Sequence, residues 1–174
     1  MLRTPPGLTA SLQMRSSRIP PPLWVLLVGA GMWALNRYWP LLALIPAPWN
    51  RMGWVIIAIS PIAFGAGAIR FRSARTTINP FRPDTATTLV TSGVYAWTRN
   101  PMYLGLLILL LGWAVILGSL SPFLGPVLFV PLMQKAQIGP EEQALRRLFG
   151  KEYEEYCSRV RRWFGRKRSA GARE

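Results

Sequence analysis

Apolar positions along the chain gather into four runs that short polar or turn-forming segments separate. The runs lie at about residues 22–39, 52–70, 101–118 and 122–137. At ~1.5 Å per residue an 18-residue helix is ~27 Å long, which is close to the apolar thickness of a bilayer. The pattern therefore predicts an all-α integral membrane protein with about four transmembrane helices.

The third and fourth runs are predicted to form a helical hairpin. Asn100 is a favoured N-cap residue and Pro101 suits the first helical position, and Ser121-Pro122 repeats this pair after the turn at Gly118-Ser119. The chain then returns to the side from which it started. Glu141-Glu142 are therefore expected at the same membrane face as Asn100-Pro101.

Three further segments complete the predicted domain, which covers residues 21–164. Prolines 40, 46 and 48 predict an interfacial connector between the first two spans. Apolar residues recur three and four positions apart through residues 140–164, with basic residues opposite them. This pattern predicts an amphipathic helical cap that lies on the membrane surface and is divided at Gly150.

The two ends of the chain carry little apolar periodicity. Residues 1–20 are predicted to form a flexible basic tail, and residues 165–174 a disordered basic one. The apolar stretch 23–35 also fits the core of a signal peptide, since Arg15 and Arg18 precede it. No small-residue cleavage site follows it, which favours a retained first span.

Composition supports a membrane class rather than a nucleic-acid-binding one. The 174 residues are 51% hydrophobic, include eight tryptophans and carry a formal net charge of +14. Lysine and arginine collect at cytoplasmic loops and anionic headgroups, whereas the aromatic residues here lie in apolar runs instead of among the arginines. We expect membrane lipids and no nucleic acid as partners, and both termini on the cytoplasmic side.

The inventory of reactive side chains is short. The chain has no histidine and a single cysteine, Cys157. Nucleophile pairs that use histidine and the usual zinc sites are therefore excluded, and no metal is expected. Carboxylates, arginines, tyrosines and the backbone remain for any chemistry.

Glu141-Glu142 are the acidic residues with two open interpretations. Glu152, Glu154 and Glu155 alternate with basic residues and indicate a solvated, salt-bridged face. Glu141-Glu142 either cap a helix start or form a ligand site with the Asn100-Pro101 helix start. A zwitterion would be matched there, because carboxylates bind an ammonium and exposed helix N–H groups bind a carboxylate.

Two motifs carry a resemblance to a known family. The runs LVTSGVYAWTRNPMYLG and GPEEQALRRLFGKEYEEYCSRVRRW resemble the isoprenylcysteine carboxyl methyltransferase and phospholipid methyltransferase group of integral-membrane enzymes. The similarity extends from about Thr76 to Trp163. The residues that match the motifs are Arg99, Pro101, Tyr103, Gly105, Glu141, Glu142, Phe149, Gly150, Tyr153 and Tyr156. The chain departs from the family at Asn100, where histidine is usual, and at Val94, where proline is usual.

The resemblance implies an S-adenosylmethionine-dependent methyltransferase that holds its cofactor at the cytoplasmic face under the cap. The implied cofactor-binding residues are Tyr95, Arg99, Asn100, Pro101, Tyr103, Gly105, Glu141 and Glu142. Two residues are candidates for catalysis. Arg146 would orient a carboxylate acceptor, and Glu142 or a tyrosine would take a proton from an amine or a thiol. The acceptor is expected to be lipid-like or hydrophobic, with O- or N-methylation left open.

Two other classes share the predicted architecture. A non-enzymatic membrane anchor or assembly protein has no reason to bring Arg99-Asn100-Pro101 and Glu141-Glu142 to one face. A small transporter or channel usually carries ionisable residues within its spans, and this sequence places none there with any clarity.

Overall fold

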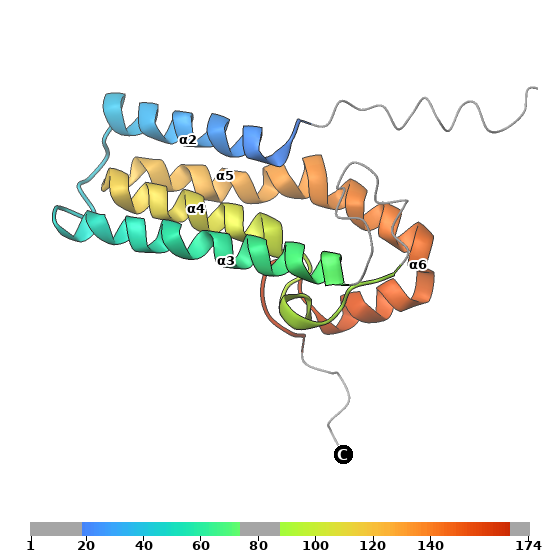
Figure 1. The fold of residues 1–174 in the computed structure, drawn as a ribbon. Coiled ribbons are helices and arrows are strands. Elements are labelled where there is room, and N and C mark those ends of the chain that lie inside the picture. Colours follow the sequence, from blue (N-terminus) through green and yellow to red (C-terminus); the bar gives the residue numbers. More distant parts are fainter. Residues whose placement is uncertain (1–18, 74–87, 168–174) are drawn as a thin grey trace, which may run out of the picture.

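The computed structural model describes residues 19–73 and 88–167, and the regular elements in these ranges are all helices (Figure 1). The helices are α2 (Pro21–Tyr38), α3 (Met52–Ser73), α4 (Pro101–Leu117), α5 (Leu124–Met133) and α6 (Gly139–Arg159). Single 3₁₀ turns lie at Trp49–Arg51, Gly93–Ala96 and Ser121–Phe123. The predicted all-α class is confirmed, since the described ranges contain isolated β-bridges but no strand.

Each predicted membrane span coincides with a helix, but its membrane-crossing character is not confirmed. Within the described ranges, no helix has both the length and the apolar character needed to cross a membrane. α4 has 17 residues and α5 has 10, whereas α2 has 18 but begins with two prolines and ends near Asn36 and Arg37.

The helix boundaries follow the proline and glycine signals of the sequence. α4 begins at Pro101 with Asn100 in the N-cap position, as predicted. The Asn100 side chain makes no capping bond, however. Its Nδ2 donates instead to the carbonyl oxygen of Arg162 at 3.0 Å. Gly118 ends α4 at φ 79°, a left-handed conformation that glycine adopts without steric cost.

Glycines let α3 and α4 pack with their backbones in contact. A Cβ on Gly112 of α4 would lie 2.8 Å from the carbonyl oxygen of Gly53, and one on Gly105 would lie 2.9 Å from that of Ser60. Such distances leave no room for a side chain, so both glycines are packing residues. α4 thus runs along α3 on one side and faces α2 and α5 on the other (Figure 1).

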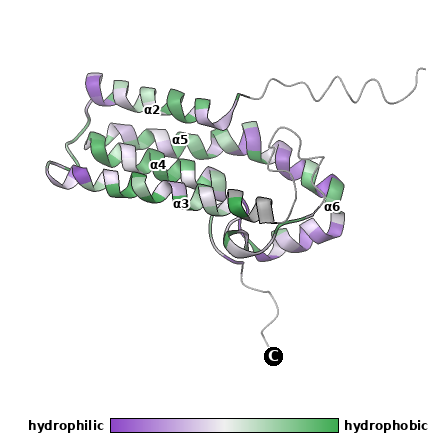
Figure 2. Cartoon of the chain, in the orientation of Figure 1, coloured by the Kyte–Doolittle hydropathy of each residue, from purple (hydrophilic) through white to green (hydrophobic). Residues whose placement is uncertain are grey.

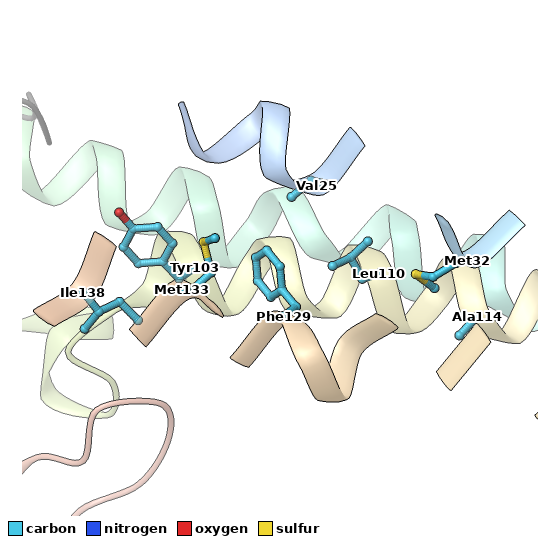
Figure 3. Close-up of a cluster of buried hydrophobic side chains, with 8 residues drawn as sticks. All are labelled: Val25, Met32, Tyr103, Leu110, Ala114, Phe129, Met133 and Ile138. Carbon is cyan, nitrogen blue, oxygen red and sulfur yellow. The ribbon is translucent and has the colours of Figure 1, made fainter. Parts of the chain in front are cut away.

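The apolar core of the bundle lies between α2, α4 and α5 (Figure 3). Phe129, Met133 and Ala114 are fully buried there, and Met32 and Leu110 are nearly so. Many large apolar side chains of α2, α3 and α5 remain exposed instead, and hydrophobic residues recur along all three helices in Figure 2. They include Leu26, Leu27, Trp33, Trp54, Ile62 and Val127.

α5 continues into α6 without the break that the sequence led us to expect at Gly139-Pro140. A π-helical turn, Gln134–Ile138, joins the two helices, and the Gly139 N–H donates to the carbonyl oxygen of Gln134. A Cβ on Gly139 would lie 2.9 Å from that same oxygen, so glycine suits this wide turn. Glu141 and Glu142 therefore do not lie at a free helix start.

α6 turns back on itself at Gly150, where the backbone has φ 48° and ψ −120°, as the sequence predicted. Its second half packs against residues 89–95 through a cluster formed by Tyr95, Tyr153, Tyr156 and Val160. Gly165–Lys167, predicted to belong to a disordered tail, instead fold back, and the Lys167 N–H donates to the Arg159 carbonyl oxygen at 2.8 Å. The predicted tails 1–18 and 168–174 lie outside the described residues.

Candidate active site

Glu142 lies at the centre of a charged cluster where α6 meets the start of α4. The residue is 5% exposed. Nε and Nη2 of Arg162 donate to its two carboxylate oxygens at 2.9 and 2.6 Å, in a bidentate geometry. Nη1 of Arg99 lies 3.3 Å from Oε1 of the same carboxylate. A buried carboxylate is thus held between two guanidinium groups, which compensates for its removal from water.

Arg99 connects Glu142 to the buried tyrosine Tyr153 of α6. Its Nη1 donates to the hydroxyl of Tyr153 at 3.4 Å and also contacts the sulfur of Cys157. Its side chain is 9% exposed. Nε of Arg99 is buried and has no hydrogen-bond partner among the described residues, and the same holds for Nε1 of Trp163. Buried donors of this kind mark places where a further acceptor would be stabilised.

Glu141 is directed to a different partner from its neighbour Glu142. The hydroxyl of Tyr103, a buried residue of the first turn of α4, donates to Oε1 of Glu141 at 2.6 Å. Consecutive carboxylates of α6 therefore contact two different parts of the 99–103 segment. The structure brings together both motifs that the sequence singled out, at the end of the bundle where it had placed them.

Backbone hydrogen bonds hold the segment after α6 against residues 97–100. The Arg99 N–H donates to the carbonyl oxygen of Arg161 at 3.2 Å, and the Gly165 N–H donates to that of Trp97 at 2.7 Å. The Arg162 carbonyl oxygen accepts from Nδ2 of Asn100 at 3.0 Å and from the hydroxyl of Thr98 at 3.5 Å. This segment lies directly over the start of α4.

Three buried tyrosines lie on the cap side of the cluster. The Tyr156 hydroxyl donates to the carbonyl oxygen of Tyr95 at 2.7 Å. Burial raises the pKa of the Tyr95, Tyr153 and Tyr156 phenols well above the usual value of about 10. The charge of Glu142 adds to the rise at Tyr153, whereas Arg99 opposes it at Tyr156. These phenols are therefore uncharged near neutral pH.

Replacing Tyr156 with phenylalanine is expected to lower the free energy of unfolding by about 1 kcal/mol at pH 8, because the bond to Tyr95 is lost. Above pH ~10 the stability of the wild type should fall by about 1.4 kcal/mol per pH unit relative to the variant, so that the difference reverses its sign by about pH 11. There the unfolded wild type loses the Tyr156 proton that the folded state still holds, so its stability falls as pH rises. Thermal unfolding in detergent between pH 8 and 11 measures both effects.

Tyr38 provides the matched control, since it is 70% exposed. Tyr38→Phe should track the wild type across the whole pH range. A constant difference between the wild type and Tyr156→Phe above pH 10 would show that the Tyr156 phenol titrates normally in the folded state.

Not every candidate residue joins the cluster. Gly105 packs against α3, and Pro101 is buried near Gly67, where an added Cβ would approach its ring to 3.0 Å. Arg146, a catalytic candidate, is exposed on α6 and pairs with none of the described acidic side chains. A catalytic role for Arg146 thus has no support from the arrangement of the described residues.

Sequence reasoning missed Arg162, Thr98 and Cys157 as members of the site. The sequence pattern places Arg162 only among the basic residues of the predicted cap. The local sequence does not distinguish Arg162 from its neighbours Arg159 and Arg161. Hydrogen bonding to Glu142 is the largest cause of the raised pKa of Arg162, so this guanidinium stays charged.

The chain matches the phospholipid methyltransferase family over residues 49–152. The match includes Arg99, Tyr103 and the two carboxylates, and it ends before Arg162. No solved structure matches the chain.

Three relatives are similar over parts of the chain. An uncharacterized protein of Haemophilus influenzae is 44% identical over 62 residues, which are 36% of this chain and 98% of the relative. A protein-S-isoprenylcysteine O-methyltransferase of Schizosaccharomyces pombe is 39% identical over 75 residues, 41% of this chain and 30% of the relative. A delta(14)-sterol reductase of Mus musculus is 31% identical over 107 residues, 52% of this chain and 25% of the relative. The matched parts thus span less than a third of either named enzyme.

Proposed function

Since the chain belongs to the phospholipid methyltransferase family, we propose that it is an S-adenosylmethionine-dependent methyltransferase that acts on a lipid-like or hydrophobic acceptor. One observation carries the proposal. Arg99, Tyr103 and the two carboxylates Glu141 and Glu142 lie within the family match, and their side chains meet although about forty residues separate the two motifs. A purely structural bundle gains nothing from burying an Arg-Glu-Arg cluster, because buried ion pairs contribute little net stability.

The residues present fit the amino-acid end of this cofactor. Glu141 and Glu142 are the carboxylates that would hold an ammonium, and Nε of Arg99 is a buried donor that lacks a partner among the described residues. Asn100, in place of the family's histidine, uses its side chain to hold Arg162. When bound, the cofactor supplies an electrophilic methyl group on a sulfonium, so the protein chiefly has to align the acceptor and exclude water.

The charges and the burial of the cluster around Glu142 determine what the protein contributes to the reaction. The cap covers the cluster with aromatic residues, which lowers the local dielectric and strengthens each ionic contact. A carboxylate acceptor is already deprotonated at neutral pH and needs only a guanidinium to orient it. An amine would have to lose a proton, for which the carboxylates of Glu141 and Glu142 are the nearest bases.

The exposed apolar side chains of α2, α3 and α5 support a membrane location in this proposal. Apolar side chains exposed in such number mark contact with lipid or protein. The basic residues of α6 and of the segment after it suit an anionic lipid surface. A hydrophobic acceptor would then reach the site from the side, along the bundle.

A reductase is the second candidate, because one matched relative is a delta(14)-sterol reductase. Reduction needs a hydride donor in place of a methyl donor. Calorimetric titration of the detergent-purified protein with S-adenosylhomocysteine and with NADPH separates the two. Binding of S-adenosylhomocysteine alone supports the methyltransferase, binding of NADPH alone supports the reductase, and binding of neither supports a non-enzymatic membrane protein.

The acceptor class is tested by incubating the protein with methyl-labelled S-adenosylmethionine and either a membrane lipid extract or a soluble metabolite pool. We expect label in the lipid fraction. Base-labile label would indicate a methyl ester, and base-stable label would indicate N-methylation. Label confined to the soluble pool would contradict a lipid-like acceptor.

A further inference from the structure

The guanidinium of Arg162 binds the carboxylate of Glu142. In the proposed function this carboxylate would instead bind the ammonium of the cofactor. The guanidinium uses both oxygens of Glu142, at 2.9 and 2.6 Å. The two partners differ in their access to solvent, since the Glu142 side chain is 7% exposed and that of Arg162 is 36% exposed. Arg162 therefore approaches Glu142 from the solvent side, whereas Arg99 approaches it from within the protein.

The side chain of Arg162 is not needed to hold its own segment in place. The four hydrogen bonds that attach residues 161–165 to residues 97–100 all use backbone atoms of the attached segment, and the ring of Phe164 also stacks on Trp97. They include the bonds from Asn100 and Thr98 to the Arg162 carbonyl oxygen. The guanidinium can thus leave Glu142 while the backbone that carries it stays docked beside the site.

A ligand ammonium cannot simply be added to Glu142. Both oxygens already accept from Arg162, and Oε1 also pairs with Arg99 at 3.3 Å. A third cation on one carboxylate would be repelled by the two guanidinium groups. Arg99 is the more enclosed of the two cations, so Arg162 is the one that would be displaced.

We propose that Arg162 is a specificity-determining residue, which an ammonium displaces from Glu142 and which then binds the anionic head of the acceptor. The inference rests on the proposed function and adds to it the charge of the acceptor. A planar guanidinium pairs with a carboxylate or a phosphate through two parallel hydrogen bonds, as Arg162 already does with Glu142. Because the backbone around Arg162 stays attached to residues 97–100, the released guanidinium remains next to the bound methyl donor.

The first test compares the affinity for S-adenosylhomocysteine in the wild type, Arg162→Gln and Arg161→Gln. Arg161 is exposed in the same segment and its side chain pairs with no described acid, so its variant is the matched control. Arg162→Gln should bind S-adenosylhomocysteine about three- to thirtyfold more tightly, because the internal competitor for Glu142 is gone. Arg161→Gln should match the wild type, and Arg162→Lys should fall in between.

The second test measures the affinity of two amphiphiles for the protein saturated with S-adenosylhomocysteine. They are an S-isoprenyl cysteine with a free carboxylate and its carboxamide, which share one apolar chain. The wild type should prefer the carboxylate by about tenfold, and Arg162→Gln should bind both alike. A structural defect would lower the affinity for both amphiphiles. Loss of the Arg162 guanidinium should lower the affinity for the carboxylate alone.

The outcomes separate the inference from the function on which it rests. If the wild type binds S-adenosylhomocysteine but Arg162→Gln binds it no more tightly, or keeps the preference for the carboxylate, the assignment to Arg162 is wrong and the methyltransferase stands. If the wild type does not bind S-adenosylhomocysteine at all, the proposed function fails and the inference fails with it.

Discussion

Replacing Glu142 with alanine should lower the free energy of unfolding by about 3 kcal/mol, the lower end of the cost of breaking a buried ion pair. The variant leaves Arg99 buried without its carboxylate, whereas the partly exposed Arg162 can turn towards water. Affinity for S-adenosylhomocysteine should also fall roughly ten- to a hundredfold, since a charge-assisted contact contributes about 1.5–3 kcal/mol. Thermal unfolding and calorimetric titration in detergent measure the two effects.

Glu154 is the control for this variant, because it is an exposed acid of the same helix. Glu154→Ala should change neither stability nor affinity by a measurable amount. Glu142→Gln keeps the shape of the side chain and removes its charge, so it tests the ionic contribution alone. Normal affinity in a folded Glu142→Ala protein would mean that the carboxylate is structural and does not bind the ligand.

Replacing Gly112 with alanine should destabilise the bundle by about 3 kcal/mol, the upper end of the range for overpacked cores. The added Cβ would lie 2.8 Å from both the Gly53 carbonyl oxygen and Cγ1 of Ile57. One of these atoms belongs to the backbone of α3 and cannot rotate away, so the two helices would have to separate. Thermal unfolding of the purified variant measures the loss.

Gly29 provides the opposite case within the same bundle. A Cβ there meets nothing within 4 Å, so Gly29→Ala should be neutral or raise stability by about 0.5–1 kcal/mol through helix propensity. Equal effects of the two substitutions would show that α3 and α4 do not pack as closely as their glycines indicate.

The helices were predictable because their signals are local. Asn100-Pro101 marks the start of α4 and Gly118 its end, and the apolar runs 22–39 and 52–70 coincide with α2 and α3 to within three residues at each boundary. The continuous passage from α5 to α6 was not predictable, because Gly139-Pro140 is read as a helix break. The wide turn that avoids the break depends on how the backbone of Gln134–Gly139 closes.

The site was predictable in its location and less so in its contacts. A hairpin of known helix length places Glu141-Glu142 near the start of α4, and the structure confirms this proximity through Tyr103 and Arg99. The choice of Arg162 as the partner of Glu142 depends on the turn at Gly150, which brings the end of α6 back across the bundle. Several exposed arginines had the same local pattern, so spacing alone could not select one.

The π-helical turn Gln134–Ile138 determines the angle, about the helix axis, at which each following side chain of α6 projects. Such a turn contains about one residue more than an α-turn, which rotates the subsequent side chains by about 100°. In an uninterrupted α-helix, Glu141 would take the angular position that Glu142 now holds. The wide turn therefore decides which of two adjacent, chemically identical side chains faces the arginines and which faces Tyr103.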